Sequence, residues 1–291
     1  MPSWYQGESF VNTGYRPIMP SIRDCLSSLF YLHNETGSIL SHALAIPIIL
    51  GLTAYTFGSV MTRPDLVGVG WQDRVVFGVL SVTNCLCLWN SATFHTFCCH
   101  SHSVNHSCLM ADFVGIVINI AGCFLASMYY GFYCNKPAQL GYIVFALCFG
   151  LAAVIVNTSK RFIHHKYMGL RLGMFMVFGF SGIIPILHIS IEYGIVFTQR
   201  AMGLNYIFLI AGFAVTAAIA FHYKIPERAF PNTFDIWGNS HQIMHLCTFG
   251  VMLVHYFGVL ESFRFWHSLN GDCSLDARTL NLDKHDPWWF W

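Results

Sequence analysis

The sequence predicts an all-α membrane protein, a seven-transmembrane helix bundle with its N-terminus inside and its C-terminus outside. Of the 291 residues, 55% are hydrophobic and only 10% are charged, whereas soluble domains carry about 25% charged residues. Seven apolar runs are also long enough to cross a bilayer, which takes about 20 residues each. These runs lie near residues 38–61, 75–97, 108–132, 139–157, 168–189, 201–222 and 241–260.

The segment before the first run predicts a short interfacial helix. Ile22, Leu26, Leu29 and Phe30 recur at helical spacing, as expected of an amphipathic helix lying on the inner leaflet. A soluble cap helix would show the same pattern. We therefore divide the chain into an N-terminal cytosolic segment (1–37), a transmembrane domain (38–260) and a C-terminal tail (261–291).

Loop charges predict the orientation. With the N-terminus inside, the inner segments hold more lysines and arginines than the outer loops, which favours this orientation. The inner positions are Arg16, Arg23, Lys160, Arg161, Lys166, Arg171, Lys224 and Arg228, and the outer loop positions are Arg63, Arg74, Lys136 and Arg200. The formal net charge of +1 gives no case for nucleic-acid binding.

Most of the eleven cysteines lie within apolar runs, where cysteine usually acts as a small buried hydrophobe. Cys134 and Cys273 instead fall on segments predicted to lie outside, where one disulfide could form.

Five polar residues are expected to meet at one membrane face. Ser91 and His95 end the second span, Asp112 begins the third, and His241 and His245 begin the seventh. Helix parity places these three span ends on the inner side. Each i, i+4 pair shares one helix face, so neighbouring helices would bring the five side chains together. Ionisable groups within membrane spans are costly and usually functional.

Three imidazoles with an open fourth position form the ligand set of a catalytic Zn²⁺ site. Asp112 would hold the attacking water, acting first as general base and then as acid. Ser91 would donate a hydrogen bond to a developing oxyanion or orient a ligand. Haem bound between His95 and either His241 or His245 is an alternative, which the third histidine and the carboxylate disfavour. Asp112 could also be an interfacial charge, and Ser91 a helix-packing residue.

The remaining histidines are interpreted differently. Lone histidines inside spans are expected to hydrogen-bond between helices, and loop histidines are expected to be solvated. The first group comprises His42, His188 and His255, and the second comprises His100, His102, His106, His164 and His165.

At these residues the chain resembles the progestin and adipoQ receptor (PAQR) family, which includes the adiponectin receptors and is similar to the haemolysin III proteins. The resemblance covers almost the whole chain. Its motifs are Leu32–Gly37, Ser91-x3-His95, Asp112, Ile225–Arg228, Phe234–Trp237 and Ser240–His245.

The resemblance implies seven helices with an inner N-terminus, zinc bound by His95, His241 and His245, and Asp112 reaching the metal through water. It also implies hydrolysis of ceramide-like lipid amides, which releases sphingosine and a fatty acid. The expected partners are membrane lipids, with ceramide or a related sphingolipid as substrate or ligand, and a homo-oligomer is compatible with the sequence. The expected location is the Golgi, the endoplasmic reticulum or the plasma membrane. The alternative is a heptahelical receptor or lipid-binding scaffold in which zinc is structural.

Overall fold

All regular secondary structure in the described residues is helical, which confirms the all-α prediction. The structure is a computed structural model that describes residues 2, 4–5, 8–159, 167–271 and 273. The helices are, in chain order, α1 (Ile22–Ser27), η1 (Ser28–Phe30), α2 (Thr36–Tyr55), η2 (Thr56–Val60), α3 (Trp71–Phe97), α4 (His102–Gly131), α5 (Lys136–Thr158), α6 (Met168–Phe180), α7 (Ile183–Tyr193), α8 (Ile195–Met202), α9 (Leu204–Tyr223) and α10 (Ser240–Ser268).

Within the part of the chain that the structure describes, seven stretches are long and apolar enough to cross a membrane, as predicted, and the chain is an integral multi-pass membrane protein. They are formed by α2 with η2, by α3, α4 and α5, by α6 with α7, and by α9 and α10. The fifth stretch bends at Ser181 and Gly182, between α6 and α7. Pro185 then occupies the first turn of α7, where its missing N–H removes no helical hydrogen bond.

Two helix boundaries and one additional short helix differ from the prediction, and at the first of them local capping outweighs hydropathy. α4 begins at His102, six residues before the predicted start at 108, because the Ser101 side chain accepts a hydrogen bond from the Val104 N–H. At the other end of the chain, α10 continues to Ser268. Residues 261–268 are therefore helical, although we assigned them to the tail. The short helix α8 begins after Gly194, which has a φ of 86°, and it was not predicted.

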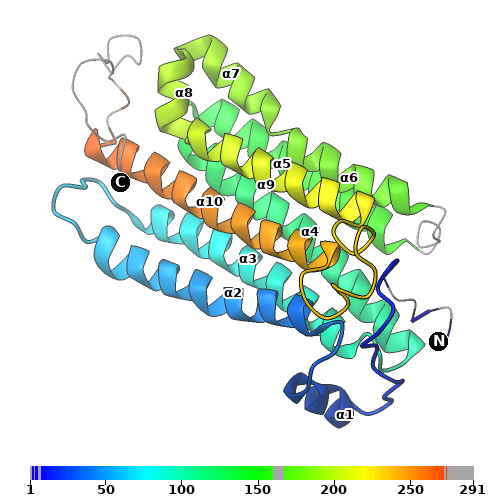
Figure 1. Ribbon diagram of the computed structural model, residues 1–291. Helices are drawn as coiled ribbons and strands as arrows, with labels where there is room; N and C mark the ends of the chain where they lie inside the picture. The colour runs from blue at the N-terminus through cyan, green and yellow to red at the C-terminus, as the bar shows by residue number, and fades with distance from the viewer. Residues whose placement is uncertain (1, 3, 6–7, 160–166, 272, 274–291) are drawn as a thin grey trace.

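The core lies where α3, α4 and α10 pack together, with α2 beside them (Figure 1). Phe77 is fully buried there, and its ring makes edge contacts with Tyr256 and Phe263 at centroid distances of 5.5 and 5.8 Å. Aromatic pairs in this arrangement contribute beyond the area that they bury. This packing fixes α3 against α10, the two helices that carry the predicted histidines.

The bundle has two chemically different ends. At one end, α1 and the N-terminal segment lie beside the connection between α9 and α10 (Figure 1). The other end holds the connection between α2 and α3, the helix α8 and the C-terminal end of α10. We call these the N-terminal end and the disulfide end.

The predicted amphipathic helix forms as α1 and η1. Its apolar residues Ile22, Leu26 and Phe30 are 62%, 44% and 91% exposed, while Cys25 is buried, with its Sγ atom 3.9 Å from that of Cys99. An exposed apolar face of this kind suits a membrane interface. Its placement on the inner leaflet stays a prediction.

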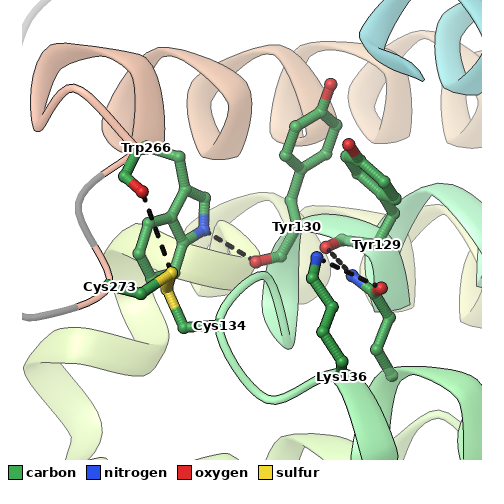
Figure 2. Close-up of a disulfide and its surroundings, with 8 residues drawn as sticks. Tyr129, Tyr130, Cys134, Lys136, Trp266 and Cys273 are labelled. Carbon is green, nitrogen blue, oxygen red and sulfur yellow. Dashed lines mark hydrogen bonds between the residues drawn. A yellow bond between two sulfur atoms is a disulfide. The ribbon is translucent and has the colours of Figure 1, made fainter. Parts of the chain in front are cut away.

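A disulfide joins Cys134, which follows α4, to Cys273, which follows α10 (Figure 2). This is the pairing that the positions of the two cysteines made conceivable. Close by, the Trp266 indole N–H donates to the Tyr130 carbonyl oxygen at 2.7 Å (Figure 2). The C-terminal ends of α4 and α10 are therefore held together by one covalent bond and one buried hydrogen bond.

A buried polar network reinforces the same end. The Asp73 carboxylate, 2% exposed, accepts hydrogen bonds from the Tyr130 hydroxyl at 2.9 Å and the Gly70 N–H at 2.8 Å. His267 Nε2 lies 3.1 Å from Asp73 Oδ1, and its Nδ1 lies 2.8 Å from the Val67 carbonyl oxygen. Because every Asp73 oxygen has a donor, the network links α3, α4 and α10 without an unpaired buried carboxylate.

Candidate metal centre

Three histidines converge at the N-terminal end of the bundle. His95 lies near the end of α3, and His241 and His245 lie in the first two turns of α10. The Nε2 atoms of His95 and His241 are 3.3 Å apart, and one ligand atom from each histidine lies within 4.8 Å of the other two. His95 and His245 are buried, whereas His241 is partly exposed. The predicted grouping of these three residues is confirmed.

The spacing of the histidines fits a tetrahedral metal. Zinc–nitrogen bonds of about 2.0–2.1 Å at tetrahedral angles place two ligand nitrogens about 3.4 Å apart. The observed 3.3 Å between His95 and His241 agrees with this value. Neutral imidazole nitrogens are also common zinc ligands. The donor set can therefore hold a zinc-like ion once the more distant ligand atoms, which lie within 4.8 Å of one another, move closer together.

Each histidine turns its other nitrogen towards an oxygen atom. His95 Nδ1 lies 2.7 Å from Glu35 Oε2, and His241 Nδ1 lies 2.9 Å from Glu8 Oε1. His245 Nδ1 lies 3.2 Å from the Ser38 carbonyl oxygen. Hydrogen bonds like those of His95 and His245 fix the tautomer and orientation of metal-binding histidines, whereas His241 and Glu8 form an ion pair without hydrogen-bond geometry. These contacts leave Nε2 of each ring as the free ligand atom.

Two of these partners are carboxylates that remain ionised. Burial alone would raise the pKa of Glu35, but the hydrogen bond and charge of His95 outweigh burial and hold the pKa below its usual value. For Glu8, burial is likewise outweighed by His241 and Lys224, so its pKa also lies below the usual range. Two negative charges beside the three histidines favour positive charge at their centre, whether it is carried by protons or by a metal ion.

Similarity to known proteins places this arrangement in a family. A sequence model described as "Haemolysin-III related" matches residues 30–256. The "Adiponectin receptor protein" of Drosophila melanogaster is 35% identical over 261 residues, covering 90% of this chain and 58% of its own length. "Progestin and adipoQ receptor-like protein 1" of Caenorhabditis elegans is 34% identical over 263 residues, covering 90% of this chain and 59% of its own length. "Progestin and adipoQ receptor family member 3" of Homo sapiens is 30% identical over 251 residues, covering 84% of this chain and 78% of its own length.

The chain belongs to the PAQR family. It spans a little under three fifths of the length of the fly and worm relatives. The matched region contains Ser91, Asp112 and the three converging histidines, but it ends before Cys273 and begins after Glu8.

In this PAQR protein, Asp112 of α4 lies close enough to His95 and His241 to interact with them electrostatically. It is not one of the three residues whose ligand atoms share the 4.8 Å group. Ser91 is 3% exposed and lies one helical turn before His95. The roles predicted for both residues remain predictions.

The other intramembrane histidines divide into two kinds. His188 Nδ1 lies 2.9 Å from the Tyr142 hydroxyl, and His255 Nε2 lies 2.9 Å from Ser127 Oγ, so both make the predicted contacts between helices. The ring of His42 instead stacks on that of His245 at a centroid distance of 3.9 Å. Neither of its ring nitrogens has a hydrogen-bond partner among the described residues. The hydrogen bond predicted for His42 is therefore not formed, because its ring faces another imidazole.

Two of the histidines assigned to loops lie on a helix instead. His102 and His106 lie in the first two turns of α4, because this helix begins earlier than hydropathy indicates. Their ring centroids are 6.4 Å apart, and they are not part of the metal group. His100 lies in the short turn before α4, with Nδ1 3.1 Å from Ser101 Oγ. His164 and His165 fall outside the described residues.

Sequence reasoning assigned no role to Glu8, Glu35 or Ser38. Glu35 lies within the motif Leu32–Gly37, so its proximity to the site could have been inferred from the motif together with helix parity. Glu8 lies in an irregular segment, with no periodic pattern to indicate which face it would meet. Only the folded chain brings it to His241.

Proposed function

We propose that this chain is a zinc-dependent hydrolase that cleaves the amide bond of ceramide or a related lipid near the inner leaflet. The observation that carries the proposal is the set of three converging imidazoles, to which the described residues add no fourth protein ligand, within electrostatic reach of Asp112. An open position is typical of catalytic zinc sites, whereas structural sites are closed by four protein ligands.

Zinc, when bound by His95, His241 and His245, supplies Lewis acidity and makes a bound water able to lose a proton near neutral pH. Asp112 would accept the proton of the attacking water. Oxygen from that water forms a new bond to the carbonyl carbon, and the carbon–nitrogen bond then breaks. Asp112 returns the proton to the departing nitrogen, which leaves as the amine of sphingosine, while the acyl group leaves as a fatty acid.

Ser91 would assist this step from α3. Its hydroxyl lies one turn from His95 and would donate a hydrogen bond to the carbonyl oxygen as negative charge develops there. The substrate would enter between helices, because it is already dissolved in the bilayer. The Golgi, the endoplasmic reticulum and the plasma membrane are the proposed locations.

The disulfide supports the proposed orientation. Disulfides persist on the lumenal or extracellular side and are rare in the cytosol. The bond between Cys134 and Cys273 lies at the opposite end from the histidines. With that end outside, the N-terminus and the metal centre face the cytosol, as the loop charges predict.

The test compares purified wild-type protein with Asp112→Ala and His245→Ala. Zinc content, thermal stability and fatty-acid release from ceramide are measured for each protein in detergent or reconstituted in vesicles. A catalytic site predicts that Asp112→Ala folds and retains about one zinc but loses turnover, whereas His245→Ala loses zinc. A zinc-containing wild-type protein that releases no fatty acid from any ceramide would count against the proposal.

A receptor or scaffold with structural zinc is the second candidate. It is favoured by the way in which the three histidines link α3 to α10 and, through Glu8, Glu35 and Ser38, to the N-terminal segment and α2. The printed names of the relatives also include receptors. In this case His245→Ala should unfold the protein, and Asp112→Ala should have no effect on any measured property. Bis-histidine haem fits less well, because axial ligands lie on opposite faces of a porphyrin whereas three imidazoles converge here.

A further inference from the structure

The N-terminal segment crosses the end of the bundle directly over the histidines. We call residues 8–16 the strap. It lies beside the connection between α9 and α10, residues 224–239 (Figure 1). An ion pair joins Glu8 Oε2 to Lys224 Nζ at 2.6 Å, and the Arg228 guanidinium lies 5.9 Å from the centre of the Phe10 ring. The Asn12 amide donates to Asn232 Oδ1 at 2.9 Å, and the Thr13 hydroxyl donates to Asp235 Oδ2 at 2.6 Å.

The strap contacts two of the three histidines. At its beginning, Glu8 Oε1 lies 2.9 Å from His241 Nδ1. At its end, Arg16 is 2% exposed, and its guanidinium donates to the carbonyl oxygen of His95. The same guanidinium donates to Ser28 Oγ at 2.8 Å, which also fixes η1. Undocking of the strap would therefore remove partners from both α3 and α10.

Glu8 is the strap residue whose charge acts directly on the candidate metal site. It lies within ion-pair distance of His241 Nδ1, and the same carboxylate neutralises the ammonium group of Lys224 at 2.6 Å. Without Glu8, an uncompensated positive charge would remain beside a site that must accept a dication. Loss of the contact with His241 and loss of the charge that neutralises Lys224 would both lower the affinity for the metal.

We propose that the strap is a regulatory cap of the metal centre, in which Glu8 couples docking of the strap to binding of the metal. The inference rests on the metal site of the proposed function, but not on its hydrolytic activity. Coupling between two binding events is reciprocal. The metal therefore stabilises the docked strap by the same factor by which the docked strap increases metal affinity. Any cytosolic event that lifts the strap would lower metal occupancy.

The experiment uses full-length wild-type protein, Glu8→Gln, Thr13→Ala and Asp65→Asn. Thr13→Ala weakens docking without touching a histidine, because Thr13 contacts Asp235. Asp65→Asn is the matched control for loss of a carboxylate, because Asp65 is exposed, pairs with Arg63 and belongs to the connection between α2 and α3. Zinc affinity is measured by chelator competition, and hydrogen exchange of residues 8–16 is measured with and without zinc. Cobalt(II) absorption reports the ligand geometry.

Removal of an outer partner of a metal ligand typically lowers affinity by about 10- to 100-fold, and we expect a loss in this range for Glu8→Gln with an altered cobalt(II) spectrum. Zinc should slow exchange of the strap in wild-type protein but not in Glu8→Gln. Thr13→Ala should speed exchange and weaken zinc binding, and Asp65→Asn should match wild type.

Two results would overturn the coupling, namely a Glu8→Gln variant with wild-type zinc affinity or a wild-type strap whose exchange is unaffected by zinc. A wild-type protein that shows the coupling yet hydrolyses no lipid amide refutes the hydrolase alone. A wild-type protein that binds no zinc overturns both.

Discussion

Replacement of Asp73 by asparagine tests whether the buried network at the disulfide end stabilises the bundle. Asp73 accepts hydrogen bonds from Tyr130 and Gly70, and its Oδ1 also faces His267 Nε2. Asparagine has one acceptor oxygen and one NH₂ group. If the NH₂ group takes the Oδ2 position, it faces the Gly70 N–H, which can only donate. If it takes the Oδ1 position, the negative charge that faces His267 Nε2 is lost.

The cost follows from burial. Removal of one member of a buried ion pair destabilises a protein by about 3–5 kcal/mol, because the partner is left uncompensated. For a protein of this size we expect the melting temperature of Asp73→Asn to fall by roughly 10 °C. Asp65→Asn is the matched control, since its ion pair with Arg63 is exposed, and exposed pairs contribute little.

Thermal unfolding of both variants in the same detergent gives the comparison, with zinc content as a second measurement. Zinc binding should be unchanged in Asp73→Asn, because the network and the histidines occupy opposite ends of the bundle. If Asp73→Asn melts within about 2 °C of Asp65→Asn, the stabilising role of the network is refuted.

Three further predictions concern single residues. Glu35→Gln replaces the charge-assisted hydrogen bond to His95 by a neutral one and should weaken zinc binding about 10-fold, measured by chelator competition, with unchanged affinity as the contrary result. Burial lowers the pKa of His33 to about 4, below its value of about 6.5 in the unfolded chain. The unfolded chain therefore takes up a proton first, so the folded state is fully stable above pH 6.5 and loses stability as the pH falls towards 4. Allowing for solvent screening, His33→Asn should reduce the acid dependence of unfolding by about 2 kcal/mol, measured in pH-stepped denaturation, and an unchanged acid dependence would contradict this assignment. Cys134→Ser should free Cys273 to react with a membrane-impermeant maleimide on intact cells that carry the protein at their surface, and labelling only after permeabilisation would reverse the proposed orientation.

Hydropathy and helix parity predicted that the three histidines lie at the same membrane face, and the packing of the helices, which the sequence did not show, brings them together. His241 and His245 share a helix face at i and i+4, and an even number of crossings returns the chain to the face where His95 lies. These regularities are set by bilayer thickness and helix pitch, and both can be counted along a sequence. The core of the candidate site was therefore accessible before any coordinates.

Other features depend on individual contacts that leave no periodic pattern in the sequence. The start of α4 at His102 is set by one serine side chain, and the partnership of Glu8 with His241 joins residues that are separated by most of the chain. His42 is another example. Its position inside an apolar span does not show whether its ring will stack on another ring or form a hydrogen bond. These details are decided by packing within the folded bundle.

The disulfide fixes the C-terminal end of α10 to the end of α4, so any tilt of α10 relative to α4 displaces mainly its N-terminal end. The 29 residues of α10 extend about 43 Å from the fixed end to the first two turns, where His241 and His245 lie. A tilt of about 5° around the fixed end would displace these turns by about 4 Å, roughly twice the length of a zinc–nitrogen bond. A small tilt of α10 about its fixed end is therefore enough to bring His241 and His245 into contact with a metal ion or to remove them from it.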